Sequence, residues 1–197
     1  MSDIFYTIDK EGTGKFVEKK SRFLSFAFHV ESADEAKARI KALQNEYHDA
    51  RHVCWAYVVG PDRLEWMAND NGEPSGTAGK PILGQINSLG LTDVAVGVVR
   101  YFGGIKLGTP GLTAAYKEAA ALALGDSGVR QCVRREVFTF SFPYLAMNDV
   151  MKTVKSSGAE IQEQQFDNSC LMSLSVRLDD ADMLRRRLSD IPGLCLL

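Results

Sequence analysis

The sequence predicts an α+β protein with two domains, a mixed-sheet domain over residues 1–132 and a smaller domain over residues 133–197. Three observations support this prediction. The run Asp93–Phe102 is apolar almost throughout, which is typical of a central strand covered on both faces. An Ala-rich helical stretch follows, and its small side chains permit close packing on a sheet. The last part of the chain has a β-α-β-β-α-β pattern, the order of a ferredoxin-like domain.

Apolar segments bounded by turn residues predict the elements of the N-terminal domain. Strands are expected over Ile4–Ile8, Phe16–Lys20, Arg22–Val30, Val53–Gly60, Leu64–Ala68 and Asp93–Phe102. Gly12-Thr-Gly14 is expected to end the first strand. Ser32 and Glu35 form a capping box that begins the first helix. The helix after Pro110 is expected to place a stripe of small residues on the sheet, formed by Leu112, Ala115, Ala119 and Leu122.

The C-terminal domain follows a basic, polar link that ends near Glu136. Its strands are expected over Val137–Phe142, Ala159–Phe166, Ser169–Val176 and Leu194–Leu197. Pro143 begins the first helix and Gly158 ends it. Asp167-Asn168 is expected to form the hairpin turn, and a second helix is expected around Leu184.

Two glycine-rich loops precede the second and third helices and form the candidate site. Asp70–Pro81 holds three glycines, two prolines and two carboxylates, with hardly any apolar side chain. The second loop, Arg100–Gly111, follows the strongest strand. Pro81 and Pro110 suit a first helical position, and Thr109 is a good N-cap. Free N–H groups at such helix starts, with glycines that allow close approach, predict an anion-binding surface.

We expect this surface to bind an anion or nucleic acid. The candidate residues are Arg51, His52, Asp70, Glu73, Ser75, Gly76, Thr77, Gly79, Lys80, Arg100, Gly103, Gly104, Lys106 and Thr109. Arg100 ends its strand at the carboxyl edge, where open α/β sheets place ligands. Two simpler interpretations stay open. The glycines only make tight turns, or Arg100 pairs with Asp70 or Glu73 and fixes the loop.

Composition limits the classes of function. The chain has 197 residues, of which 45% are hydrophobic and 24% charged, as is ordinary for a globular protein. Its net charge of −2 gives no global attraction to nucleic acid or membrane, so such binding requires a local patch. The four cysteines form no C-x-x-C pair and the three histidines lack ligand-like spacing, which argues against a zinc site. Without a leader or membrane-spanning run, we expect a cytoplasmic protein.

The glycine-rich loops carry a family resemblance. Asp70–Pro81 and Val99–Leu112 closely resemble the two signature stretches of the Impact family, in the expected order, and Ala50-Arg-His52 also fits. Bacterial members are often called YigZ-like proteins. The resemblance implies that the N-terminal domain shares the fold of the second domain of a small-subunit ribosomal protein and of elongation factor G domain IV. It implies that the C-terminal domain is similar to that factor's last, ferredoxin-like domain.

The resemblance favours a non-catalytic protein that binds RNA, the ribosome or a translation factor. Eukaryotic Impact proteins regulate translation by competing for a kinase activator, but they carry an additional N-terminal domain, so that role is not expected to carry over whole. Tyr101 and Phe102 could stack on bases, whereas Asp70 and Glu73 would repel phosphates unless paired with cations. We expect no catalytic residue, no cofactor, no metal and no membrane partner.

An enzyme or binder acting on a small phosphorylated metabolite or nucleotide is the alternative. There, Lys80 and Arg100 would bind the anion, Asp70 or Glu73 would hold magnesium, and His52 would move a proton. The segment Gly76–Pro81 has the wrong spacing for a P-loop and a proline in place of the hydroxyl, which argues against this alternative. A third interpretation makes the loops a protein-docking surface.

Overall fold

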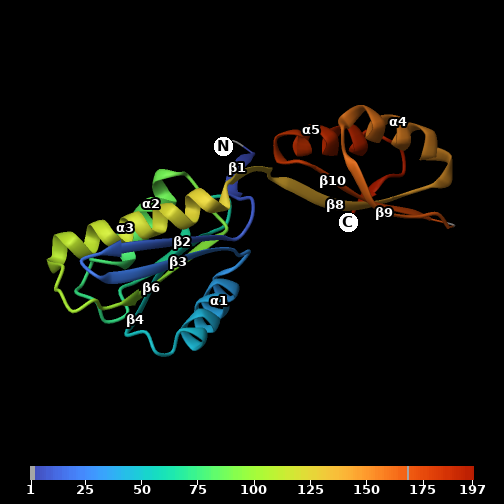
Figure 1. Ribbon diagram of the computed structural model, residues 1–197. Coiled ribbons are helices and arrows are strands. Elements are labelled where there is room, and N and C mark those ends of the chain that lie inside the picture. The colour runs from blue at the N-terminus through green and yellow to red at the C-terminus, as the bar shows by residue number, and fades with distance from the viewer. Residues whose placement is uncertain (1–2, 168) are drawn as a thin grey trace. The chain divides into compact units, whose positions relative to one another are not determined.

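The chain divides into two compact units. The computed structural model describes residues 3–167 and 169–197. The N-terminal unit comprises Phe5–Cys132, and the C-terminal unit comprises Val133–Leu197 together with Asp3 and Ile4. Each unit combines helices with an antiparallel sheet (Figure 1), which confirms the predicted α+β class.

A five-stranded sheet with the order β2-β3-β6-β4-β5 forms the centre of the N-terminal unit. Its strands are β2 (Gly12–Glu18), β3 (Ser21–His29), β4 (His52–Val59), β5 (Glu65–Asn69) and β6 (Val94–Tyr101). Each neighbouring pair is antiparallel. The sequence suggested a mixed sheet, but this sheet is antiparallel throughout. The reason is that β6 inserts between β3 and β4, which run parallel to each other and are joined by α1 (Ala33–Glu46). β1 (Ile4–Ile8) and β7 (Val129–Val133) form a separate two-stranded sheet.

Helices cover both faces of the five-stranded sheet. α2 (Gly79–Ser88) and α3 (Gly108–Ser127) pack on one face, and α1 packs on the other (Figure 1). β6 is the middle strand and is buried from Val94 to Arg100, which confirms the expected central strand covered on both faces. The main core cluster contains sheet residues such as Phe23 and helix residues such as Ile82 and Tyr116.

Both helices that follow the glycine-rich loops begin earlier than predicted. α2 begins at Gly79 and α3 at Gly108, so Pro81 and Pro110 occupy the third helical position rather than the first. Proline is tolerated there because the first N–H groups of a helix have no partner within the helix. Thr109 consequently lies inside α3 and is not its N-cap, which is Leu107.

Gly12 and Gly14 lie within β2 and do not end a strand. A Cβ on Gly12 would lie 2.2 Å from the Ala123 carbonyl oxygen, and one on Gly14 would lie 2.7 Å from the Leu122 Cβ. Close contact between β2 and α3 therefore explains both glycines. Leu122 itself is 39% exposed and does not belong to the buried stripe that the sequence predicted. That stripe includes Leu112, Ala115, Tyr116, Ala119, Ala120, Ala123 and Leu124.

The C-terminal unit has the predicted ferredoxin-like order. Its elements are β8 (Arg135–Phe142), the short 3-10 helix η1 (Tyr144–Ala146), α4 (Met147–Ser157), β9 (Glu160–Gln165), β10 (Cys170–Arg177), α5 (Leu178–Ser189) and β11 (Cys195–Leu196). The sheet order is β11-β8-β10-β9, and each pair is antiparallel. Gly158 ends α4 with a φ of 68°, as predicted. β9 and β10 pair as the predicted hairpin requires, while Asn168 of its turn lies outside the described residues.

An ion pair connects the start of the described chain to the C-terminal unit. Arg177 donates two hydrogen bonds to the buried carboxylate of Asp3, at 2.8 and 3.0 Å. The backbone N–H of Arg134 also donates to the Asp3 carbonyl oxygen, at 2.6 Å. These contacts explain why Asp3 groups with residues far along the sequence.

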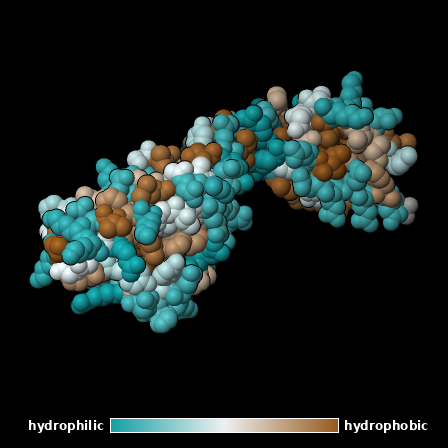
Figure 2. All heavy atoms as spheres, viewed as in Figure 1, coloured by the Kyte–Doolittle hydropathy of each residue, from teal (hydrophilic) through white to brown (hydrophobic). Residues whose placement is uncertain are grey.

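The surface agrees with an ordinary globular composition. Figure 2 shows hydrophilic and hydrophobic residues interspersed over the visible face of each unit. In the described ranges, no helix combines the length and the apolar character required to cross a membrane.

Replacing Gly12 with alanine is expected to destabilise the N-terminal unit by about 1–3 kcal/mol, because the new methyl group overlaps the backbone of α3. Gly125→Ala in the same helix is the control, since a Cβ there meets no atom of the described residues within 4 Å. It is expected to stabilise the unit by about 0.5–1 kcal/mol through helix propensity. Urea unfolding followed by circular dichroism measures both effects, and equal effects would contradict the close contact.

Candidate functional site

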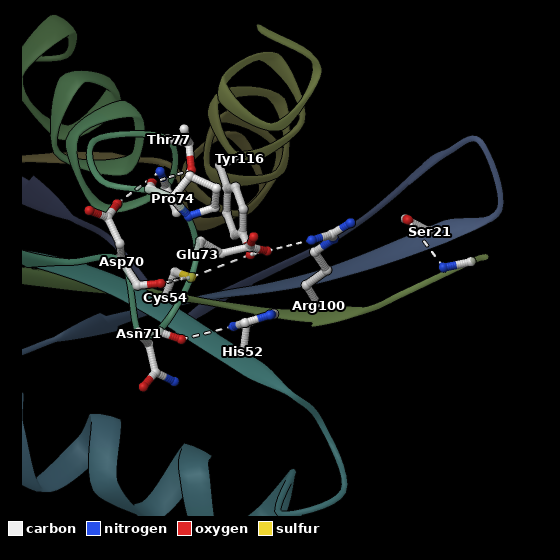
Figure 3. A network of polar contacts seen from close by, with 12 residues as sticks. Ser21, His52, Cys54, Asp70, Asn71, Glu73, Pro74, Thr77, Arg100 and Tyr116 are labelled. Atoms are coloured by element: carbon white, nitrogen blue, oxygen red, sulfur yellow. Dashed lines mark hydrogen bonds and ion pairs between the residues drawn. The ribbon is translucent and has the colours of Figure 1, made fainter. Parts of the chain in front are cut away.

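The half-buried carboxylate of Asp70 accepts hydrogen bonds from backbone N–H groups at the beginning of α2 (Figure 3). Its Oδ1 accepts hydrogen bonds from the N–H groups of Ala78 at 3.0 Å and Gly79 at 2.8 Å, and its Oδ2 accepts one from Gly76 at 2.8 Å. Burial raises the pKa of Asp70, but these bonds and the charge of Lys80 outweigh burial and leave the pKa below its ordinary value. The start of α2 therefore already holds an anion, which belongs to the protein itself.

Glu73 forms a buried ion pair with Arg100 (Figure 3). Glu73 Oε1 accepts hydrogen bonds from Arg100 Nη1 at 2.6 Å and from the Tyr116 hydroxyl at 2.8 Å. The two charged side chains are only 4% and 8% exposed, so the charges are largely desolvated and neutralise each other. The pairing agrees with the simpler interpretation left open by the sequence, in which Arg100 pairs with a loop carboxylate and fixes the loop. Through the Tyr116 hydroxyl, it joins β6, the Asp70–Pro81 loop and α3.

Two core residues extend the network, and the sequence did not identify either as part of the site. Cys54 Sγ lies 3.0 Å from the Asp70 carbonyl oxygen and 3.3 Å from the Tyr116 hydroxyl. Burial raises the pKa of Cys54 to about 12 and also raises the pKa of Tyr116, so both groups stay protonated and can donate. The sequence did contain one indication for Tyr116: it lies one helical turn after Leu112, so its side chain is expected on the buried face of α3.

A hollow of about 340 Å³ opens beside the ion pair. The predicted site residues that line it are Arg51, His52, Glu73, Arg100, Lys106 and Thr109. Phe102 and Gly108 also line it, and Phe102 is 54% exposed. Leu107, the N-cap residue of α3, has an apolar side chain that makes no capping hydrogen bond, and Leu107, Gly108 and Thr109 border the hollow.

Arg100 retains an unused donor at the wall of this hollow. Its guanidinium lies close to two aromatic rings, with Cζ 5.7 Å from the ring centroids of both Phe23 and Phe102. Arg100 Nε has no hydrogen-bond partner within the described parts of the chain. Buried donors are normally paired, so this one marks an incompletely satisfied region.

His52 holds the neighbouring loop in place. Its Nδ1 lies 2.9 Å from the carbonyl oxygen of Asn71, a residue with a positive φ of 42°. Because a carbonyl oxygen only accepts, Nδ1 carries a proton in this contact, and in the neutral ring Nε2 is the acceptor. His52 thus has a structural contact on one side and borders the hollow on the other.

The structure divides the predicted site into two parts. Lys80 lines a different hollow, together with residues such as Arg63 and Trp66, so the structure does not bring Lys80 and Arg100 to one hollow as the sequence suggested. The physical reason is that Asp70 occupies the start of α2, beside Lys80. The remaining predicted residues of the first loop either form local hydrogen bonds or are exposed to solvent. Gly76 and Gly79 donate to Asp70, Thr77 donates to the Pro74 carbonyl oxygen at 2.6 Å, and Ser75 is exposed.

Gly103 and Gly104 shape the loop before α3. A Cβ on Gly103 would lie 2.0 Å from the carbonyl carbon of Lys20, and the N–H of Gly103 donates to Ser21 Oγ at 3.2 Å (Figure 3). Gly104 has a φ of 88°, which favours glycine. Both glycines therefore have geometric roles beside the hollow.

The carboxylates of this region are poorly placed for a magnesium ion. Both oxygens of Asp70 and Oε1 of Glu73 already accept hydrogen bonds. In addition, no cluster of three His, Cys, Asp or Glu side chains suited to a metal occurs in residues 3–167 and 169–197. Because these carboxylate oxygens already accept hydrogen bonds, the structure argues against the magnesium role considered for Asp70 and Glu73.

Comparisons with known proteins agree with this architecture. The model of the Impact N-terminal domain matches residues 19–124. An IMPACT family member from Haemophilus influenzae is 37% identical over 162 residues, which cover 80% of this chain and 78% of that protein. The IMPACT family member YigZ from Escherichia coli is 43% identical over 119 residues, covering 59% of this chain and 54% of the relative. The crystal structure of a hypothetical protein matches 100% of this chain and 98% of its own, at 29% identity and a TM-score of 0.74.

The family-model match and the identity to the Haemophilus influenzae relative, which extends over most of both chains, show the family of this chain. The chain is a member of the Impact family, as its two signature stretches predicted.

Glu73→Gln is expected to destabilise the N-terminal unit by about 3–5 kcal/mol, because it leaves the Arg100 charge buried without a partner. Tyr116→Phe is the matched comparison, since it removes a hydrogen bond to the same oxygen but no charge, and is expected to cost about 1–2 kcal/mol. Chemical unfolding monitored by Trp55 and Trp66 fluorescence measures both. A Glu73→Gln protein as stable as Tyr116→Phe would contradict the buried ion pair.

Proposed function

We propose that this protein binds RNA, and that an RNA phosphate group lies in the hollow beside the start of α3. The single observation that carries the proposal is the surplus of positive charge around that hollow. Arg100 neutralises Glu73 internally, so Arg51 and Lys106, both exposed, remain available. The uncapped start of α3 adds a partial positive charge of about half a unit.

An exposed aromatic ring at the hollow supports an RNA ligand over a simple anion. Phe102 is 54% exposed and lies next to the cations that would hold a phosphate. Proteins that bind single-stranded nucleic acid combine a cationic groove with aromatic rings on which bases stack. Phe102 and the neighbouring Lys106 supply both parts of this arrangement.

The proposed role is binding rather than catalysis. Cys54 and Tyr116 stay protonated because burial raises the pKa of each, and His52 is held by a backbone carbonyl. Family membership and the translation role of eukaryotic members favour RNA of the translation machinery, or a ribosome-bound factor, as the partner.

A small phosphorylated metabolite or nucleotide is the second candidate ligand. The volume of the hollow, about 340 Å³, falls within the usual range for small-molecule sites. The cations and Phe102 would then hold the phosphate and base of one nucleotide. Competition between a mononucleotide and a single-stranded oligonucleotide distinguishes the candidates, because only RNA spanning several phosphates gives a steep dependence on salt.

A salt series on binding of a fluorescent single-stranded RNA tests the proposal. Lys106→Gln is expected to lower affinity across unrelated sequences and to reduce the slope of log K against log salt by about 0.7. Lys80→Gln is the control, because it removes the same charge from the separate hollow and should leave the slope unchanged. Absent or salt-independent binding, or equal effects of the two variants, would contradict the proposal.

A further inference from the structure

We propose that Lys19 and Lys20, in the turn between β2 and β3, form two further phosphate contacts of the same RNA-binding surface. This inference rests on the proposed function and extends it beyond the hollow. It predicts that the RNA runs as a single strand from the hollow beside α3 to the β2–β3 turn.

The two lysines occupy backbone positions that suit other residues better. Glu18 pairs with Ser21, so Lys19 and Lys20 are the two residues of the hairpin loop. Their φ angles are 45° and 66°, and a positive φ at both positions is the signature of a type I′ turn. Such turns favour Asn-Gly, because an ordinary side chain in the left-handed region is sterically strained. Two lysines here lower stability, so we infer that their side chains serve binding.

The turn is fixed against the loop that leads into α3. Gly103 approaches Lys20 so closely that a Cβ on Gly103 would lie 2.0 Å from the Lys20 carbonyl carbon. The N–H of Gly103 donates to Ser21 Oγ at 3.2 Å, a bond visible beside the labelled Ser21 in Figure 3. Because Gly103 directly follows Phe102, these contacts hold the turn close to the part of the loop that forms the wall of the hollow.

The lysines and the hollow flank the same helix start. Lys19 lines a neighbouring hollow together with Leu107 and Gly111, and Leu107 also lines the hollow that contains Lys106. Figure 1 shows the β2–β3 turn and the start of α3 at the same end of the N-terminal unit. The first turn of α3 therefore has cations on both sides.

The local charges define the path of the strand. Lys19 and Lys20 are both exposed. Glu18 and Glu118 also border the hollow that Lys19 lines, so phosphates are expected to avoid the part of that hollow near the two carboxylates. We infer that the RNA passes instead over the side of the loop that carries Phe102 and Lys106. Single-stranded RNA fits this line of cations around an exposed ring better than a compact anion does.

A turn-optimised variant separates binding from folding. Lys19→Asn/Lys20→Gly is expected to raise Tm by about 2–4 °C, because Asn-Gly suits the turn. The same variant is expected to weaken RNA binding by roughly tenfold and to reduce the salt slope by about 1.4, because two phosphate contacts are lost. Lys37→Gln/Lys41→Gln on α1 removes the same charge from the opposite face of the sheet, and should leave the RNA affinity and the salt slope unchanged.

The outcomes distinguish the inference from the proposed function. If the wild-type protein binds no RNA, the proposed function fails and the inference fails with it. If the wild type binds, and Lys106→Gln weakens binding, but the turn variant keeps the wild-type affinity and slope, only the inference is overturned. Lys19→Gln/Lys20→Gln removes the two charges but does not introduce the Asn-Gly pair that favours the turn. It is expected to show the same loss of binding, and wild-type binding by this folded variant would likewise overturn the inference.

Discussion

The buried ion pair between Glu73 and Arg100 is the interaction on which the arrangement of the site depends. It joins the central strand β6 to the first glycine-rich loop, and the Tyr116 hydroxyl adds α3 to the same carboxylate oxygen. A buried charge pair is costly to desolvate and is weak evidence for stability in itself. Its consequence here is electrostatic. With Glu73 neutralised, the exposed Arg51 and Lys106 dominate the charge beside the start of α3.

The two helix starts, which look equivalent in the sequence, have different chemical roles. Each begins with Gly-X-Pro after a glycine-rich loop. At α2, the Asp70 carboxylate accepts three N–H bonds, so the protein supplies its own anion. At α3, the N-cap residue Leu107 makes no side-chain capping bond. The first loop thus supplies an internal acceptor to its helix start, whereas the second loop places the exposed Lys106 beside a helix start whose N-cap residue is apolar.

Much of the fold could be predicted from the sequence because local signals determine it. The ferredoxin-like order, the C-cap at Gly158 and the central strand β6 all follow from short patterns. The close contact that requires Gly12 could not be predicted, because it depends on α3, more than 100 residues away. For the same reason, sequence reasoning placed Lys80 and Arg100 together. Which side of a loop a carboxylate such as Asp70 faces is a matter of tertiary packing, which the loop's composition does not encode.

The most direct measurement is an NMR titration of the backbone amides, first with inorganic phosphate and then with a short single-stranded RNA. If the start of α3 is the open one, the amide signals of Gly108, Thr109 and Gly111 shift with ligand concentration. The amide signals of Gly76, Ala78 and Gly79 do not shift, because these N–H groups already donate hydrogen bonds to Asp70. Shifts centred on the α2 start, or no shifts at either helix, would contradict the assignment of α3 as the phosphate-binding end.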